Sequence, residues 1–269
     1  MTPPGQGSTL PVPPGRPAAT PLVFAHRGAS AALPEHTLAA YERALADGAD
    51  GLECDVRLSR DGHVICLHDR RLDRTSNGTG PVSSYTLAEL SRLDFGSWRD
   101  GADPAPVLTL DRLLRAVREA ARPVRLLIET KHPSRFGANL ERRLVEVLRR
   151  HDLADPGPDC PVRVSVASFS PPALRRVRAL APALATVQLL ELLPPGRWVG
   201  GLLFGAAAAG PSIDLVRSRP GLVPALRGSG HQVYVWTVNE SSDLDLLARH
   251  GVDAVITDRP ADALAHLGR

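Results

Sequence analysis

The sequence predicts an α/β fold, a closed (β/α)8 barrel in one domain with a small insertion after the second strand. Three observations predict it. Apolar runs typical of buried strands alternate with helical patterns along the chain, eight strand candidates can be counted, and polar clusters fall where these strands end. The length of 269 residues also suits one such barrel. An open doubly wound sheet is the alternative, but no G-x-G-x-x-G follows the first strand.

The strand candidates are short apolar runs of the kind that parallel sheets bury on both faces. They are Leu22–His26, Gly51–Arg57, Val124–Lys131, Val162–Ala167, Leu184–Leu189, Gly200–Phe204, His231–Val238 and Val252–Thr257. Helical periodicity lies between most of them. The helix candidates are Leu38–Asp47, Leu110–Ala121, Leu140–His151, Pro172–Leu180, Ile213–Arg217 and Ser241–His250. The long, turn-rich segment of about 70–106 breaks this alternation, so we expect an insertion there.

The remaining features place the domain at residues 22–269, behind a tail at 1–21. The tail is rich in proline and lacks a charged start followed by an apolar stretch, so we expect disorder and no signal peptide. No apolar run reaches the roughly 18 residues of a membrane span, and we expect no stable membrane insertion. The three cysteines show no metal-ligand spacing, and Cys54 and Cys66 lie inside strand candidates. Buried free thiols are therefore expected, which favours a cytoplasmic location.

The net charge of +3 and the pI near 9.0 raise the question of a polyanionic partner. The arginines are spread over the predicted helices, and aromatic residues make up only 4% of the chain. No basic stripe or stacking platform results, so we expect no nucleic-acid partner. The sequence does not indicate the oligomeric state.

The segment GLECDVRLSRDGHVICLHD, residues 51–69, is the most informative part of the chain. It predicts two strands joined by a turn at Asp61-Gly62. Because side chains alternate along a strand, Glu53 and Asp55 share one face while Cys54 lies on the other. Two unpaired carboxylates are costly to bury, and a hard divalent cation removes that cost. An exposed strand face is the alternative explanation.

Other polar side chains end neighbouring strands on the rim where barrel enzymes carry their sites. His26 and Arg27 lie at the end of the first strand, His68 ends the hairpin, and Glu129 and Lys131 end the third barrel strand. Lys131 is the only lysine beside 31 arginines, which indicates a need for a compact ammonium group. A structural histidine or a surface Glu-x-Lys pair would explain each feature singly. Together they indicate phosphoryl chemistry, with acids for a cation and histidines for proton transfer.

An ordered set of motifs carries a resemblance over residues 23–260. The motifs are HRG at 26–28, PEHT at 34–37, ECDV at 53–56, HD at 68–69, LDRTSNGTG at 72–80, IETK at 128–131, WTVN at 236–239 and GVDAVITD at 251–258. With them the chain resembles the glycerophosphodiester phosphodiesterase family of (β/α)8 TIM barrels. Each motif alone is weak, but their order and spacing together are specific.

The resemblance implies roles for individual residues. Glu53, Asp55 and Glu129 match the ligands of one divalent metal ion, Mg²⁺ or Ca²⁺, and His26 and His68 match the acid/base pair. Arg27 and Lys131 match the phosphate-binding cations, and Trp236 matches a residue lining the substrate mouth. The implied substrate is a small glycerophosphodiester, such as glycerophosphocholine or glycerophosphoethanolamine, which is hydrolysed to sn-glycerol 3-phosphate and an alcohol.

The chain departs from the family pattern at His36, where the family usually has asparagine. His36 and its neighbour Glu35 are therefore further candidate site residues, although an acid at a helix start also fits Glu35. A related barrel acting on lysophospholipids or sphingomyelin, including a lyase that stops at the cyclic phosphate, remains an alternative activity. A silent phosphate-binding module is another, which the intact set of acids and histidines disfavours.

Overall fold

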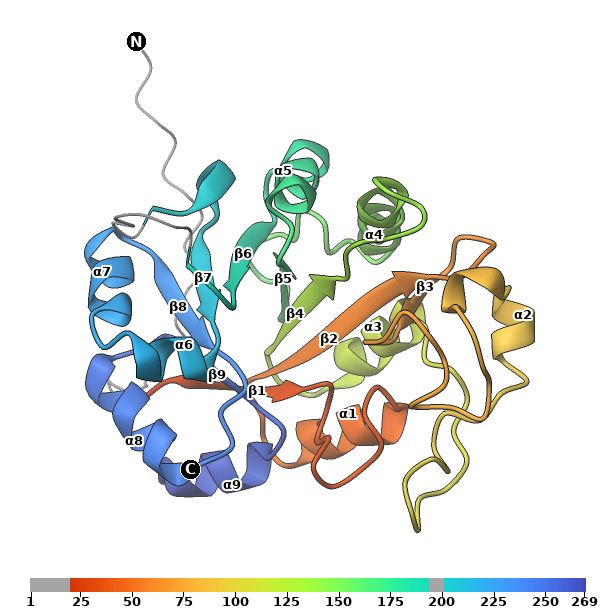
Figure 1. Cartoon of the computed structure of the whole chain (residues 1–269), viewed down its shortest axis with the longest axis horizontal. Helices are drawn as coiled ribbons and strands as arrows, with labels where there is room; N and C mark the ends of the chain where they lie inside the picture. The colour runs from red at the N-terminus through yellow and green to blue at the C-terminus, as the bar shows by residue number, and fades with distance from the viewer. Residues whose placement is uncertain (1–19, 194–200) are drawn as a thin grey trace.

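The computed structural model describes residues 20–193 and 201–269, in which eight parallel strands close into a barrel (Figure 1). The strands of the barrel are β1 (Leu22–His26), β2 (Gly51–Leu58), β4 (Val124–Thr130), β5 (Val162–Ser168), β6 (Ala185–Leu190), β7 (Ala208–Pro211), β8 (Gln232–Val235) and β9 (Ala254–Thr257). Each strand pairs with the next in this order, and β9 pairs with β1. Strand β3 (Val64–Cys66) runs antiparallel to β2, which confirms the predicted hairpin.

Helices lie around the outside of the strands (Figure 1). They are α1 (Leu38–Ala46), α2 (Leu87–Leu90), α3 (Leu110–Glu119), α4 (Asn139–Arg150), α5 (Pro171–Leu180), α6 (Ile213–Ser218), α7 (Leu222–Gly228), α8 (Ser241–His250) and α9 (Pro260–His266). Several of these helices begin at a residue whose side-chain oxygen accepts a hydrogen bond from a backbone amide of the first turn. Thr37 accepts a hydrogen bond from the Ala40 amide at the start of α1, and Thr109 caps α3 in the same way. Helix α8 ends at Gly251, whose φ of 64° suits a residue without a Cβ.

Alternation along the strands separates the inside of the barrel from its helical coat. On β2, Cys54 and Val56 pack into the apolar layer beneath the helices, while Glu53 and Asp55 lie on the opposite face. The inside is filled by a second cluster, made of Leu22, Phe24, Leu127, Ala167, Val187, Leu189, Ala208, Tyr234, Ala254 and Ile256. Inward positions are therefore apolar in the lower barrel and become polar toward the strand ends of β1, β2 and β4.

One predicted strand is wrong. Of the candidate at 200–204, residue 200 lies outside the described residues, and Leu203–Gly205 form a short 3-10 helix, η2. Phe204 there has a φ of 52°, which no strand allows. The sixth barrel strand is instead β7, whose Ala-Ala-Gly-Pro sequence is a poor strand former but pairs with both β6 and β8.

The predicted insertion packs around a small core of its own. After β3 the chain forms a 3-10 turn, η1 (Val82–Ser84), and helix α2 before it returns to α3. The core of the insertion consists of Ile65, Leu67, Leu72, Val82, Leu90, Phe95 and Val107. This packing fixes the segment against the β2–β3 hairpin, beside the strand ends that carry the polar residues.

Other predictions concern the ends and the surface of the chain. The predicted disordered tail at 1–21 falls almost entirely on residues 1–19, which lie outside the described residues. Cys54 and Cys66 are buried and free, as predicted, and Cys160 is a partly buried free thiol. Within residues 20–193 and 201–269, every helix is too short or too polar to cross a bilayer.

Candidate active site

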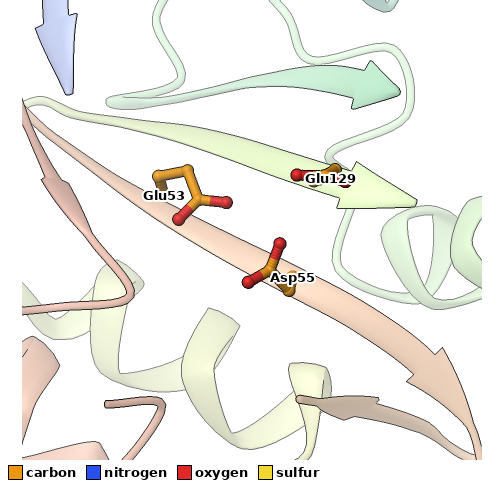
Figure 2. A group of neighbouring side chains, drawn as sticks. All are labelled: Glu53, Asp55 and Glu129. Atoms are coloured by element: carbon orange, nitrogen blue, oxygen red, sulfur yellow. The ribbon is translucent and has the colours of Figure 1, made fainter. Parts of the chain in front are cut away.

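Three carboxylates meet at the carboxyl ends of two neighbouring strands. Glu53 and Asp55 come from β2 and Glu129 comes from β4, where the strand register sets Asp55 beside Glu129. Each acid is buried, and one oxygen from each lies within 4.8 Å of the others. Figure 2 shows the three carboxyl groups directed toward a common space between the two strands. The structure therefore brings together the three acids predicted as metal ligands.

Of the three acids, Asp55 has the most basic side chains around it. Its carboxylate oxygens lie 3.0 Å from the Lys131 ammonium and 3.1 Å from Nε of Arg27. Nε2 of His36 lies 3.0 Å from the same carboxylate. Burial alone would raise the pKa of Asp55, but Lys131, the His36 hydrogen bond and Arg27 together hold it well below its usual range. Asp55 is thus ionised across the physiological pH range.

The other two acids have less cationic compensation. Burial and the nearby Asp55 charge raise the pKa of Glu53 well above its usual value and that of Glu129 to about 8. Lys131 contacts Glu129 at 2.8 Å but is shared with Asp55. The three buried acids share Lys131 and Arg27 as their cationic partners, which leaves negative charge for a hard divalent cation that prefers carboxylate oxygens. The donor set fits the predicted Mg²⁺ or Ca²⁺.

Both predicted acid/base histidines are backed by a carboxylate. Nδ1 of His26 lies 2.7 Å from Asp258, and Nδ1 of His68 lies 2.6 Å from Asp69. Hydrogen bonds and nearby positive charges lower the pKa of Asp258 and hold that of Asp69 at about 2, so both are acceptors only. Each Nδ1 must therefore carry its proton, which leaves Nε2 of each ring to exchange a proton. Burial lowers the pKa of His68 to about 4, which keeps it neutral near pH 7.

Asp258 is itself held in place by the rim of the barrel. It accepts hydrogen bonds from the Ser30 hydroxyl at 2.8 Å and from the Asn239 amide at 2.6 Å. The side chain of Asn239 also accepts from the Asp258 backbone amide. The ITD and VN segments of the sequence therefore position His26, a role that the residues alone did not reveal.

Glu35 and His36 belong to the layer behind the cavity. Glu35 accepts from Arg27 at 2.9 Å and from two nitrogens of Arg74, whose guanidinium also contacts Asp69. His36 is buried with a φ of 59°, and it bridges Asp55 and the Tyr41 hydroxyl. Burial lowers the pKa of His36, so the ring is neutral near pH 7. Neither residue lines the cavity. Glu35 holds Arg27, which does line it, and His36 holds Asp55 of the acidic cluster behind it.

A cavity of about 320 Å³ opens at this end of the barrel. It is lined by His26, Arg27, Glu53, His68, Leu127, Glu129, Lys131, Ala167, Phe169, Leu189, Glu191, Trp236, Thr237 and Ile256. The predicted mouth residue Trp236 is among them. Phe169 and Glu191 were not predicted. Each lies two residues after an inward-facing residue of its strand, Ala167 on β5 and Leu189 on β6, and the same alternation had placed Glu53 and Asp55 on one face. The arrangement can bind a phosphate, place a cation beside it and move protons on either side.

Fold and site together define a barrel enzyme built for phosphodiester chemistry. The sequence model of the glycerophosphoryl diester phosphodiesterase family matches residues 26–262. The chain belongs to this family.

Individual relatives span nearly the whole chain. A Mycobacterium tuberculosis protein named "Probable glycerophosphodiester phosphodiesterase 1" is 46% identical over 93% of both chains. The glycerophosphodiester phosphodiesterase of Bacillus subtilis is 35% identical, covering 89% of this chain and 84% of its own. Among solved structures, an Oleispira antarctica phosphodiesterase in complex with the product sn-glycerol-3-phosphate is 27% identical, with a TM-score of 0.77. That alignment covers 93% of this chain and 98% of the other.

Proposed function

We propose that this chain hydrolyses small glycerophosphodiesters, such as glycerophosphocholine or glycerophosphoethanolamine, to sn-glycerol 3-phosphate and an alcohol. The observation that carries the proposal is the pair of carboxylate-backed histidines on one cavity with three clustered acids. The Oleispira antarctica neighbour, solved with sn-glycerol-3-phosphate, supports the same product. We assign the reaction to the cytoplasm, where buried free thiols such as Cys54 and Cys66 persist.

The cation of this proposal is one Mg²⁺ or Ca²⁺ held by Glu53, Asp55 and Glu129. When bound, it supplies positive charge that stabilises the negative charge developing on the phosphate. Lys131 contacts Asp55 and Glu129 and reaches the cavity, so its ammonium can turn to a phosphate oxygen without leaving the acids. Arg27 is fixed by Glu35 and Asp55 and offers its guanidinium to the same phosphate.

The histidines move the two protons of the reaction. Nε2 of one ring takes the proton of the glycerol hydroxyl next to the phosphate, and this oxygen attacks phosphorus. The bond from phosphorus to the alcohol oxygen breaks, and the other ring protonates the leaving alcohol. A cyclic phosphate results, and water opens it to sn-glycerol 3-phosphate with the proton transfers reversed. Asp258 and Asp69 keep a proton on Nδ1 of each ring, so that Nε2 is free to accept a proton in the ring that acts as base and carries a second proton in the ring that acts as acid.

Glycerol 3-phosphate release from glycerophosphocholine tests the proposal. His26→Ala or His68→Ala should lower kcat by about 10²- to 10⁴-fold while the protein stays folded. His63→Ala is the matched control, because the imidazole of His63 is exposed and, among the described residues, is paired only with the exposed Asp61. Release should stop with EDTA and return with Mg²⁺ or Ca²⁺. Near-normal turnover in either histidine variant would remove the acid/base assignment, and accumulation of cyclic phosphate would identify a lyase.

A further inference from the structure

The cavity has two chemically distinct halves. The half formed by β1, β2, β4 and the hairpin carries the histidines, acids and cations described above. The other half, formed by β5, β6, β8 and β9, is lined by apolar and aromatic side chains. Glu191 is the one carboxylate that the second half presents among the described lining residues. A substrate that fills both halves must therefore present an anion to one side and a different group to the other.

Strand alternation explains which residues stand over this second half. Ala167 on β5 and Leu189 on β6 belong to the apolar cluster inside the barrel. Phe169 and Glu191 each lie two residues farther along, just beyond their strand ends, so they continue the inward rows to the mouth. Trp236 follows Tyr234 of β8 in the same way. The rim thus carries two aromatic rings and one acid.

The two rings form a fixed aromatic corner. Their centroids are 5.4 Å apart with perpendicular planes, and Nε1 of Trp236 donates to the Gly210 carbonyl at 2.7 Å. Phe169 remains 42% exposed although it packs against Trp236. An edge-to-face pair covers one face of one ring only, and the remaining ring faces can attract cations that carry apolar substituents.

Glu191 adds a negative charge beside these rings. Its side chain is exposed, lines the cavity and makes no ion pair or hydrogen bond in residues 20–193 and 201–269. An uncommitted carboxylate that lines the same cavity as two aromatic rings is the chemistry that binds alkylated ammonium groups. The cationic half and this anionic, aromatic half together match a zwitterion with a phosphate at one end and an ammonium group at the other.

We propose that Phe169, Glu191 and Trp236 form a subsite for the alcohol part of the substrate, selective for alcohols that carry an ammonium group, such as choline. The subsite rests on the proposed hydrolysis of glycerophosphodiesters and specifies which of them the cavity favours. Apolar or neutral alcohols contact the rings but leave Glu191 without a partner, so they bind less tightly.

The test compares glycerophosphocholine with glycerophosphoglycerol, because both contain the same phosphodiester and differ in the charge of the alcohol. The wild type should show the higher kcat/KM on the choline ester. Glu191→Gln should lower kcat/KM for the choline ester about 10-fold more than for the glycerol ester, the size expected when a partly shielded ammonium group loses its carboxylate partner. Glu146→Gln, an exposed acid on α4, is the control. Equal changes on both substrates overturn the subsite.

Binding of tetramethylammonium, followed by calorimetry, tests the subsite without turnover. Saturable binding that Phe169→Leu and Glu191→Gln each weaken supports it, and no binding to the wild type overturns it. Hydrolysis of neither ester, together with tetramethylammonium binding, would refute the proposed reaction and leave the cation subsite standing. Hydrolysis of both esters with equal kcat/KM and no tetramethylammonium binding would support the proposed reaction and refute the cation subsite.

Discussion

Arg74 of the insertion ties together the residues behind both sides of the phosphate site. Its Nε lies 2.7 Å from Asp69, the partner of His68, and its Nη1 lies 2.7 Å from Glu35. Glu35 in turn accepts from Arg27 at 2.9 Å. Replacing Arg74 with methionine keeps much of its apolar bulk and removes the charge and its five donors. We expect Arg74→Met to destabilise the protein in a pH-dependent way.

The pKa of Glu35 sets the size of the effect. Burial alone would raise it, but the Arg74 hydrogen bonds and the Arg27 and Arg74 charges hold it at about 2 instead of 4.5. A pKa about 2.5 pH units lower corresponds to at most about 3.4 kcal/mol of stability, at about 1.36 kcal/mol per unit. Arg27 shares this contribution, and the Arg74 side chain is 44% exposed and screened by water. We therefore expect Arg74→Met to lower the free energy of unfolding by about 1–2 kcal/mol at pH 7.

The pH dependence distinguishes a charge effect from lost packing. A carboxylate whose folded pKa is lowered stabilises the fold fully above its unfolded pKa, and this stabilisation disappears as pH falls through the folded value. For Glu35 the window runs from pH 4.5 down to about 2. The difference between wild type and Arg74→Met should thus be full at pH 7 and clearly smaller at pH 3.

Urea unfolding at both pH values measures the difference. Arg71→Met is the matched control, because Arg71 lies in the same insertion and pairs with an exposed acid, Asp73. Exposed pairs contribute about 0–1 kcal/mol, so this variant should lose less than Arg74→Met at pH 7. A loss for Arg74→Met that is as large at pH 3 as at pH 7 would refute the electrostatic account, as would no loss at pH 7.

Two further substitutions test the layer that orients the site. Asp258→Asn should lower kcat by about 10²- to 10⁴-fold with little change in KM, because an amide no longer fixes the His26 tautomer; steady-state kinetics with unchanged kcat would contradict this. His36→Asn should stay folded and active with a melting temperature within about 2–4 °C of wild type. Asparagine tolerates the positive φ of 59° at this position. The variant loses the hydrogen bond between residue 36 and the Tyr41 hydroxyl, but that hydroxyl still donates to the Glu53 carbonyl. Thermal unfolding that shows a much larger drop would mean that the imidazole is needed.

The sequence predicted the elements whose own residues favour their structure. Strand β2 was identifiable because acids and apolar residues alternate along it, and the Asp61-Gly62 turn marks the hairpin. The strand expected at 200–204 was wrong because strand pairing, not propensity, selects Ala208–Pro211. Helix α7 was missed because Pro224 argues against a helix, yet it lies in the first turn, where no amide bond is lost.

The site divides in the same way. Residues that end a strand in a recognisable motif, such as His26 and Glu129, could be predicted from local sequence. Two long-range pairs that orient the site could not, because Asp258 lies 232 positions from His26 and Arg74 lies 39 positions from Glu35. Such pairs are specified by the closing of the barrel and by the packing of the insertion. One local signal was available and unused: alternation continued past the ends of β5 and β6 points to Phe169 and Glu191.

The insertion supplies a cation that pairs with acidic side chains beside the site. Buried carboxylates at the ends of β2 and β4 destabilise the fold unless cations and hydrogen bonds surround them. Lys131 and Arg27 come from barrel strands and their ends, but Arg74, which holds Glu35 and Asp69 in place, comes from the insertion. The apolar core of the insertion anchors this arginine to the hairpin. Removing the insertion would therefore leave the barrel strands intact and the orientation of Arg27 and His68 unsupported.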